Sequence, residues 1–445
     1  MLLGPDRMKT LLETAFKKAG ADAEGVLEVS RQAVTRFAAN RIHQNVAEED
    51  ARASFRVAMG RRVGGARTNG RDRQRLAECV RTAARVAQAQ REDPEFPGFV
   101  RSECAPAPPG AALDAYDITT ASLSPRDRAR AVLPAVRLAG ESGFEASGAL
   151  TVSSTELAVA NTLGTFRYQP STWAQLHVVV RSGDAEAAWT ETSERWTDID
   201  PVRVARLAVE RCKRSLSPVE IEPGDWPVVL EPEAVADMLE LLAWMGLGAT
   251  AVLEGRSFLC GRSGERVASE KVTILDDGLR PGSPPRPFDY EGVSKRRVVF
   301  IDKGVARGPV YDTRTAARAG TQSTGHALPE PNTFGPYPLN LAMEPGDSSL
   351  DEMIASTARG VLVSRFHYTN PVDPRKTVIT GMTRFGTFLI EDGKVTKAVK
   401  SMRFTDSILD GLSRVEAVGK ELRRVEDTLA PAVKLSSWRF TGVTA

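Results

Sequence analysis

Cysteine and histidine are both scarce in this sequence, with four of each among 445 residues. The cysteines are Cys79, Cys104, Cys212 and Cys260. Because they lie far apart and form no C-x-x-C pair, the sequence excludes the disulfide framework of a small secreted domain and favours reduced thiols in the cytoplasm. The histidines are His43, His177, His326 and His367. No two of them have the spacing of metal ligands on one element, so no local histidine site is predicted.

Long apolar runs and an excess of one charge sign are missing too. No stretch reaches the roughly 18 apolar residues of a transmembrane helix. The first residues, MLLGPDRMKT, lack the apolar core of a signal peptide, so we expect a cytoplasmic protein without a membrane partner. The formal net charge is only +2. The most basic run, residues 61–75, is broken by glycines and lacks aromatics, so no nucleic-acid partner is predicted.

The composition that is present is typical of a soluble globular protein, with 42% hydrophobic and 26% charged residues. A chain of this length exceeds the usual size of one domain. At residues 217–225, SPVEIEPGD, two prolines and a glycine interrupt the periodic pattern and mark a boundary. We predict an N-terminal domain over residues 1–216, with a proline-rich connection at 92–109, and a C-terminal domain over 222–445.

The first half has the pattern of an α+β domain, in which an antiparallel sheet carries helices on one face. Alternation predicts strands at 25–31, 35–37, 41–46, 51–59, 62–68 and over most of 146–181. Helical spacing predicts helices at 5–18, 72–88, 201–216 and from Ser124 onward. Gly60 suits a hairpin turn, and Pro134 is expected to kink its helix or end it early.

The centre of the chain, residues 226–247, reads WPVVLEPEAVADMLELLAWMGL. A short apolar strand at 227–230 is followed directly by a helix. Pro232 suits the first helical position, where its missing N–H costs nothing, and Glu233 in the first turn favours the positive end of the helix dipole. The apolar residues that follow at helical spacing are Val235, Met238, Leu239, Leu242 and Met245.

The second half reads as strand-rich with few covering helices. Predicted strands lie at 271–275, 297–301, 305–310, 361–368, 378–382, 387–390 and 395–399. Ser349 and Glu352 form a capping box that opens a helix, which Gly360 is expected to close. A final helix is predicted over residues 406–418. The fold class is therefore α+β with two domains.

Five stretches carry a family likeness. They are KKAGADAEGVLEVSR, WPVVLEPEAVADML, FDYEGVSKRRVVFIDKGVARGPVYDTRTAAR, NTFGPYPLNLAMEPGDSSLDEMIASTARGVLV and TGMTRFGTFLIEDGKVTKAVKSMRFTDSIL. Together they lie within residues 8–420, and over that length the chain resembles the TldD/TldE family, also called PmbA/TldD or "modulator of DNA gyrase". In its TldD half, the central helix carries H-E-x-x-x-H and a C-terminal cysteine completes a zinc site.

This sequence departs from that zinc motif. Aligned on E-A-V, the two histidine positions fall on Pro232 and Asp237, and only Glu233 is kept. No cysteine follows Cys260. The chain therefore resembles the TldE (PmbA) half, which implies a pseudo-peptidase subunit with no catalytic residues and no metal of its own.

The resemblance implies that a TldD-like partner supplies zinc in a heterodimer that degrades or processes unfolded peptides. A homodimer that binds peptides or regulates, without proteolysis, is an alternative. A second alternative is a peptidase with a non-standard metal site made of Glu233, Asp237 and a distant histidine. Whether this chain is an enzyme is left open by these alternatives.

The residues themselves offer few candidate sites. Glu233 and Asp237, four apart on a helix, share a face and could bind a hard cation, but two carboxylates make a poor cage. The other interpretation is a first-turn acid plus a solvated aspartate. His177, in an apolar strand, is expected to be a satisfied sheet residue. Gly325 and His326 lie in a loop that resembles the family's cleft loop, which implies a substrate groove. No G-x-S-x-G, H-E-x-x-H or P-loop motif occurs.

Overall fold

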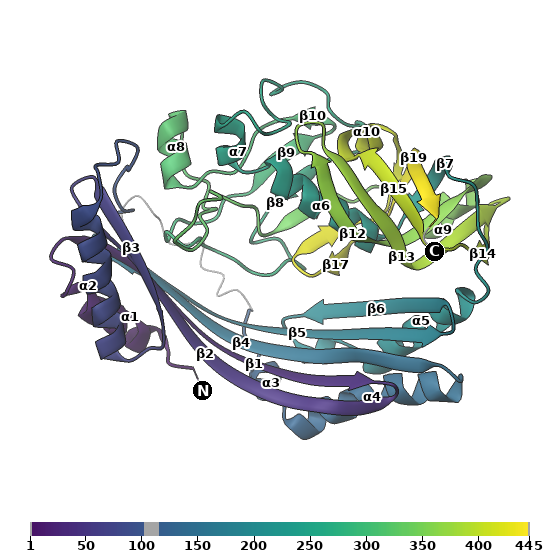
Figure 1. Ribbon diagram of the computed structural model, residues 1–445, viewed down its shortest axis with the longest axis horizontal. Coiled ribbons are helices and arrows are strands. Elements are labelled where there is room, and N and C mark those ends of the chain that lie inside the picture. Colours follow the sequence, from purple (N-terminus) through teal and green to yellow (C-terminus); the bar gives the residue numbers. More distant parts are fainter. Residues whose placement is uncertain (1, 102–114, 444–445) are drawn as a thin grey trace.

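A computed structural model describes residues 2–101 and 115–443 of the protein (Figure 1). Cys104 and part of the expected connection at 92–109 lie outside these residues. Three sheets organise the described chain: one is built from the first half and two are built from the second half. No helix in the described ranges is long and apolar enough to cross a membrane.

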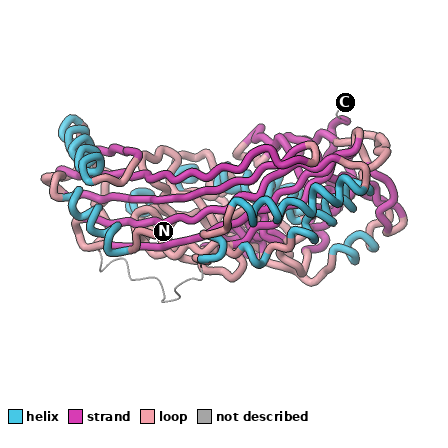
Figure 2. Tube along the Cα trace, turned by 90° about the horizontal axis from the view of Figure 1, so that it is seen from below, coloured by secondary structure: helices cyan, strands magenta, loops and turns pink. Residues whose placement is uncertain are grey.

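The first half forms a six-stranded antiparallel sheet in the order β3-β2-β1-β4-β5-β6. Its strands are β1 (Asp22–Ala38), β2 (Arg41–Met59), β3 (Arg62–Asn69), β4 (Glu145–Asn161), β5 (Phe166–Ser182) and β6 (Ala185–Ser193). Its helices are α1 (Pro5–Phe16), α2 (Arg73–Ala89), α3 (Ile118–Ala121), α4 (Pro125–Glu141), η2 (Trp196–Asp198) and α5 (Pro201–Arg214). The predicted antiparallel sheet with helices on one face is confirmed, because α1, α2, α4 and α5 all pack on the outer face (Figures 1 and 2).

The long strands differ from the five short segments predicted over residues 25–68. β1 and β2 each run unbroken, and they turn at Ala39 and Asn40, which both adopt left-handed backbone. The polar residues that suggested breaks are paired across the two strands, with Arg31 opposite Glu49 and Gln32 opposite Glu48, so they do not interrupt the ladder. β1 is also paired on both sides, with β2 and β4. The hairpin turn at Gly60 is confirmed.

Pro134 is predicted to kink its helix or to end it early, and the prediction of an early end is wrong. α4 continues through Pro134 to Glu141, seven residues further on. Four residues on the same helix are buried against the sheet: Ala131, Val132, Ala135 and Ala139. Their burial holds the last two turns in place although one backbone hydrogen bond is lost.

The second half contains a ring of five paired strands, in the order β12-β7-β19-β15-β13, which closes because β13 also pairs with β12. The strands are β7 (Gly224–Leu230), β12 (Arg359–Asp373), β13 (Val378–Glu391), β15 (Met402–Ser407) and β19 (Val433–Val443), with β14 (Lys394–Ala398) and β16 (Val415–Val418) attached. Phe366, Phe404 and Trp438 pack together in its core. Closure leaves this ring few free strand edges.

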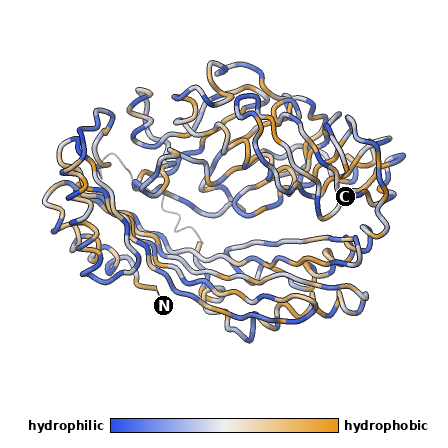
Figure 3. The backbone as a smooth tube through the Cα atoms, viewed as in Figure 1, coloured by the Kyte–Doolittle hydropathy of each residue, from blue (hydrophilic) through white to orange (hydrophobic). Residues whose placement is uncertain are grey.

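A third sheet has the order β10-β9-β8-β11-β18-β17. It contains β8 (Ile274–Asp276), β9 (Val298–Asp302), β10 (Val305–Ala306), β11 (Leu341–Met343), β17 (Arg423–Val425) and β18 (Thr428–Ala430). The helices of this half are α6 (Pro232–Gly246), α7 (Ala249–Leu253), α8 (Thr313–Ala319), α9 (Leu350–Ala355) and α10 (Ile408–Ser413). Hydrophobic residues concentrate in α6 and the strands around it (Figure 3), so the strand-rich second half with few covering helices is confirmed.

Three local predictions for the second half are corrected. The helix that Ser349 caps ends at Ala355, and Gly360 lies in β12, where a Cβ would approach the carbonyl oxygen of Pro227 to 2.7 Å. The final helix is only α10, because the following residues form β16 and pair with β19. The segments 378–382 and 387–390 are one strand, β13, with pairing on both sides.

Candidate functional site

The junction of β7 and α6 holds Glu233 at the start of a buried helix. Pro232 takes the first helical position, as predicted, and the backbone N–H of Glu231 donates to the carbonyl of Val363 in β12. The apolar residues predicted to face the core are all buried: Val235, Met238, Leu239, Leu242 and Met245. Packing on this face fixes where the first-turn carboxylates lie.

Two arginines enclose the carboxylate of Glu233, which is 6% exposed. Arg211 from α5 lies 3.6 Å away, and Arg423 from β17 lies 3.3 Å away. Arg211 also contacts Glu231 at 2.6 Å. Both guanidinium groups stack on the ring of Trp189 in β6, at 4.8 Å and 4.0 Å from its centroid. Charge pairing and stacking therefore tie α6 to the first half of the chain.

Asp237 lies one turn further along α6 and is half-buried. It accepts a hydrogen bond from the backbone N–H of Phe366, and Arg365 lies 4.0 Å away. Burial raises the pKa of Asp237 to about 8, although Arg365 opposes the rise. Burial likewise raises the pKa of Glu240 to about 7, with a contribution from Glu426. The interpretation of Asp237 as a solvated aspartate is wrong, since the Phe366 backbone and Arg365 cover it.

The residues at this junction do not fit a zinc ion. Pro232 has no donor atom, Glu233 is surrounded by guanidinium groups that would repel a cation, and Asp237 favours its protonated form. Within residues 2–101 and 115–443, no three His, Cys, Asp or Glu side chains come together to hold a metal. His177 hydrogen-bonds Thr190 in the neighbouring strand, as a satisfied sheet residue would.

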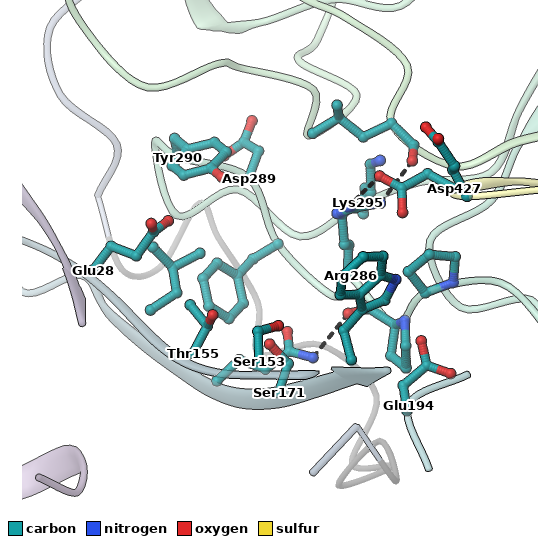
Figure 4. A pocket seen from close by; sticks show the side chains of 18 of the residues that line it. Glu28, Ser153, Thr155, Ser171, Glu194, Arg286, Asp289, Tyr290, Lys295 and Asp427 are labelled. Atoms are coloured by element: carbon teal, nitrogen blue, oxygen red, sulfur yellow. Dashed lines mark hydrogen bonds and ion pairs between the residues drawn. The ribbon is translucent and has the colours of Figure 1, made fainter. Parts of the chain in front are cut away.

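A cavity of about 500 Å³ lies between the second half of the chain and the face of the first sheet that its helices leave uncovered (Figure 4). Gly325 and His326, the predicted groove residues, both line it. Gly325 needs positive φ, and a Cβ there would lie 2.5 Å from the Ser294 carbonyl. The imidazole Nε2 of His326 lies 2.8 Å from Asp276, and its Nδ1 lies 3.0 Å from Thr324. Whether either residue meets a substrate stays a prediction.

Charges around His326 form a buried network. Asp276 pairs with Lys295 at 3.1 Å, and Lys295 donates to Asn340 at 2.9 Å. Burial lowers the pKa of His326, with Asp276 opposing. Burial by itself would raise the pKa of Asp276, but Lys295 and His326 hold it well below its usual range. His326 is thus fixed by the network and is not free to rotate toward a ligand.

Sequence reasoning missed the residues that define the surroundings of Glu233 and the cavity. Arg211 and Arg423 lie 212 positions apart in the sequence and come together in space at Glu233 and Trp189. The cavity also contains polar side chains from β4 and β5, among them Ser153, Thr155 and Ser171. Their alternation within the strands was the one available signal, but alternation does not show what lies opposite.

Comparison with known proteins places the second half. Residues 223–442 match the family described as the PmbA/TldA metallopeptidase C-terminal domain. The second half of the chain is therefore similar to that domain. A metalloprotease of Methanothermobacter thermautotrophicus is 29% identical over 231 residues, which are 50% of this chain and 49% of that protein. A TldD homologue of Haemophilus influenzae is 32% identical over 50% of this chain and 46% of its own length. The matches span about half the length of these relatives.

Solved structures of the PmbA/TldD type share the whole fold. TldE from Thermococcus kodakarensis superposes with a TM-score of 0.87 at 22% identity, covering 98% of this chain and 100% of that one. A structure from Bacteroides thetaiotaomicron whose name refers to a modulator of DNA gyrase gives 0.85 at 22% identity, covering 99% and 100%. At this identity the likeness shows the fold alone.

Proposed function

We propose that this chain is a non-catalytic, TldE-like subunit of a TldD/TldE-type zinc metallopeptidase complex that degrades or processes unfolded peptides. The PmbA/TldD domain, the TldE-like fold and the metalloprotease names of the relatives support this proposal. A TldD-like partner chain would bring the zinc. The free thiols of Cys79 and Cys212 are buried, which fits a reducing cytoplasm as the location.

The observation that carries the proposal is the pair of arginines around Glu233. The carboxylate of Glu233 is already paired with Arg211 and Arg423, and their positive charges would repel a cation. It is therefore poorly suited to metal binding. What this region does offer is a rigid wall, in which α6, β6 and β17 are tied together. We assign the chain that structural part in enclosing a peptide cleft.

The proposal is tested by co-expressing this chain with a TldD-like chain that carries H-E-x-x-x-H. We expect a 1:1 complex on size exclusion that digests unfolded peptides, while this chain alone digests nothing. A shared, cleft-enclosing interface of this kind buries on the order of 2,000 Å² or more. The partner alone is the control. The proposal fails if the two chains migrate separately at micromolar concentration and the partner cleaves equally well by itself.

A homodimeric peptide-binding or regulatory protein without proteolysis is the second candidate. The cavity between the sheet and the second half favours it, because its lining can bind a ligand without any catalytic group. The same size-exclusion experiment separates the two. A stable dimer of this chain that does not exchange with the TldD-like partner would favour the second candidate.

A further inference from the structure

The floor of the cavity carries hydroxyl groups from two neighbouring strands, beside Leu157 and Trp173 of the same strands. Ser153 and Thr155 are two residues apart on β4, and Thr155 lies directly opposite Ser171 of β5. All three point from the sheet toward the second half (Figure 4). Among the residues that the structure describes, none hydrogen-bonds to these three hydroxyls. A hydroxyl both donates and accepts, so this floor presents uncommitted groups of both kinds.

The charged side chains of the cavity are already paired with one another. Arg424 contacts Glu194 at 2.6 Å, and Arg286 contacts Asp427 at 2.8 Å. Lys295 is held by Asp276.

Three further acids, Glu28, Asp289 and Glu426, line the cavity. The carboxylate of Asp289 accepts backbone N–H groups of Glu291, Val293 and Ala327, and burial raises its pKa. Burial also raises the pKa of Glu28. Glu426 is exposed. Because the cations of the lining are paired, it gives an anionic ligand little net attraction.

The wall opposite the hydroxyl floor has apolar surface beside its charged side chains. It contains Phe288 and Tyr290 together with Pro284, Pro285 and Leu339. Gln169 of β5 donates to the carbonyl of Pro285 at 2.9 Å and so links floor and wall at one end. The cavity is thus a slot with hydrogen-bonding groups on one side and apolar surface on the other.

We propose that this slot binds an extended, uncharged peptide segment, whose backbone amides hydrogen-bond to Ser153, Thr155 and Ser171 and whose side chains rest on the apolar wall. Peptide N–H and C=O groups alternate along a chain, and hydroxyls match either one without reading the sequence. The closed ring β12-β7-β19-β15-β13 argues against strand addition in that part of the second half. This inference rests on the proposed function and names where this subunit holds substrate.

The test measures peptide binding by the full chain on its own. The probe is a fluorescent peptide of Ala, Ser, Leu and Gly, acetylated and amidated so that it carries no charge, and the readout is anisotropy. The variant Ser153→Ala with Thr155→Val and Ser171→Ala keeps the cavity's shape but removes its hydroxyls. We expect its affinity to fall about tenfold or more with an unchanged melting temperature. Ser154→Ala is the matched control, because Ser154 faces the opposite side of β4.

Three results would overturn the inference. The triple variant could bind like the wild type, the wild type could fail to bind the peptide at millimolar concentration, or it could prefer charged peptides with a strong salt dependence. Ser171→Trp, which fills the slot, gives a second reading and should abolish binding. None of these outcomes depends on complex formation, so co-purification with a TldD-like partner still tests the proposed function separately.

Discussion

The carboxylate of Glu233 lies between two guanidinium groups at the start of α6. At this scale the neighbours of a side chain decide its chemistry. A first-turn glutamate with open space around it could bind a cation, whereas this one is neutralised by Arg211 and Arg423. Trp189 fixes both arginines by stacking, so the arrangement is rigid. Electrostatics, more than the loss of ligand residues alone, makes this position unsuitable for a metal.

The pairing of Glu233 with Arg423 gives a measurable prediction. In a double-mutant cycle with Glu233→Gln and Arg423→Met, each single variant should lower the free energy of unfolding, because each removes one side of a largely buried ion pair. The double variant should lose less than the sum, with a coupling of about 1–3 kcal/mol by chemical denaturation. The exposed pair Lys400–Glu220 is the control, and Lys400→Met should have no measurable effect. Additive losses would show that Arg423 and Glu233 do not interact.

At the scale of elements, α4 shows packing overriding a local signal. Pro134 sits in the interior of a helix that continues for seven more residues. The helix carries Ala131, Val132, Ala135 and Ala139 into the core between the sheet and α5. Long strands show the same effect, since β1 keeps its length by pairing on both sides.

Pro134→Ala should therefore stabilise the protein. Alanine restores the missing backbone hydrogen bond and removes the clash between the proline ring and the preceding turn. The unfolded chain gains some entropy, which offsets part of this, so the net gain in unfolding free energy should be about 1–2 kcal/mol. Thermal unfolding measures it. Pro125→Ala is the control, because a proline in the first turn costs nothing and its removal should give no gain. A lower melting temperature for Pro134→Ala would mean that the sheet face requires the proline's shape.

Across the whole molecule, Arg56 joins the two halves of the chain. In the first sheet it contacts Glu24 at 2.5 Å, and in the second half it contacts Glu291 at 3.1 Å and Glu330 at 3.2 Å. One guanidinium group thus faces three carboxylates. Burial, together with repulsion from Glu291 and Glu330, raises the pKa of Glu24 to about 7 against the pull of Arg56.

This contact predicts a pH dependence of stability. Because the pKa of Glu24 is higher in the folded state than in the unfolded state, the folded protein holds a proton that the unfolded chain releases. The stabilisation is fully present below about pH 4.5 and is lost as the pH rises through about 7. The full loss is on the order of 3 kcal/mol. Thermal unfolding from pH 5 to pH 8 should show a smaller decline for Glu24→Gln than for the wild type.

The matched control for this prediction is Glu13→Gln, which removes an exposed carboxylate on α1. It should leave the decline unchanged. Other buried acids, including Asp237, add to the wild-type decline in the same direction, so the difference between Glu24→Gln and wild type is the informative quantity. A steeper decline in Glu24→Gln would contradict the raised pKa of Glu24.

Sequence by itself determined the fold class, the strand-to-helix junction at Pro232, the buried face of α6 and the capping box at Ser349. These depend on periodicity, on proline geometry and on contacts between near neighbours, all of which are local. The five sequence stretches within residues 8–420 also indicated the family, because each can be recognised from its own consecutive residues.

Tertiary structure alone decided the lengths of β1 and β13, the continuation of α4 and the ring of strands in the second half. It also decided both sites. Arg211, Glu233 and Arg423 come from three separate elements, and the hydroxyl floor of Ser153, Thr155 and Ser171 acquires an apolar wall only when the second half packs over it. The physical reason is that charge, burial and cavity shape depend on distances in space between residues far apart in sequence, which no local pattern encodes.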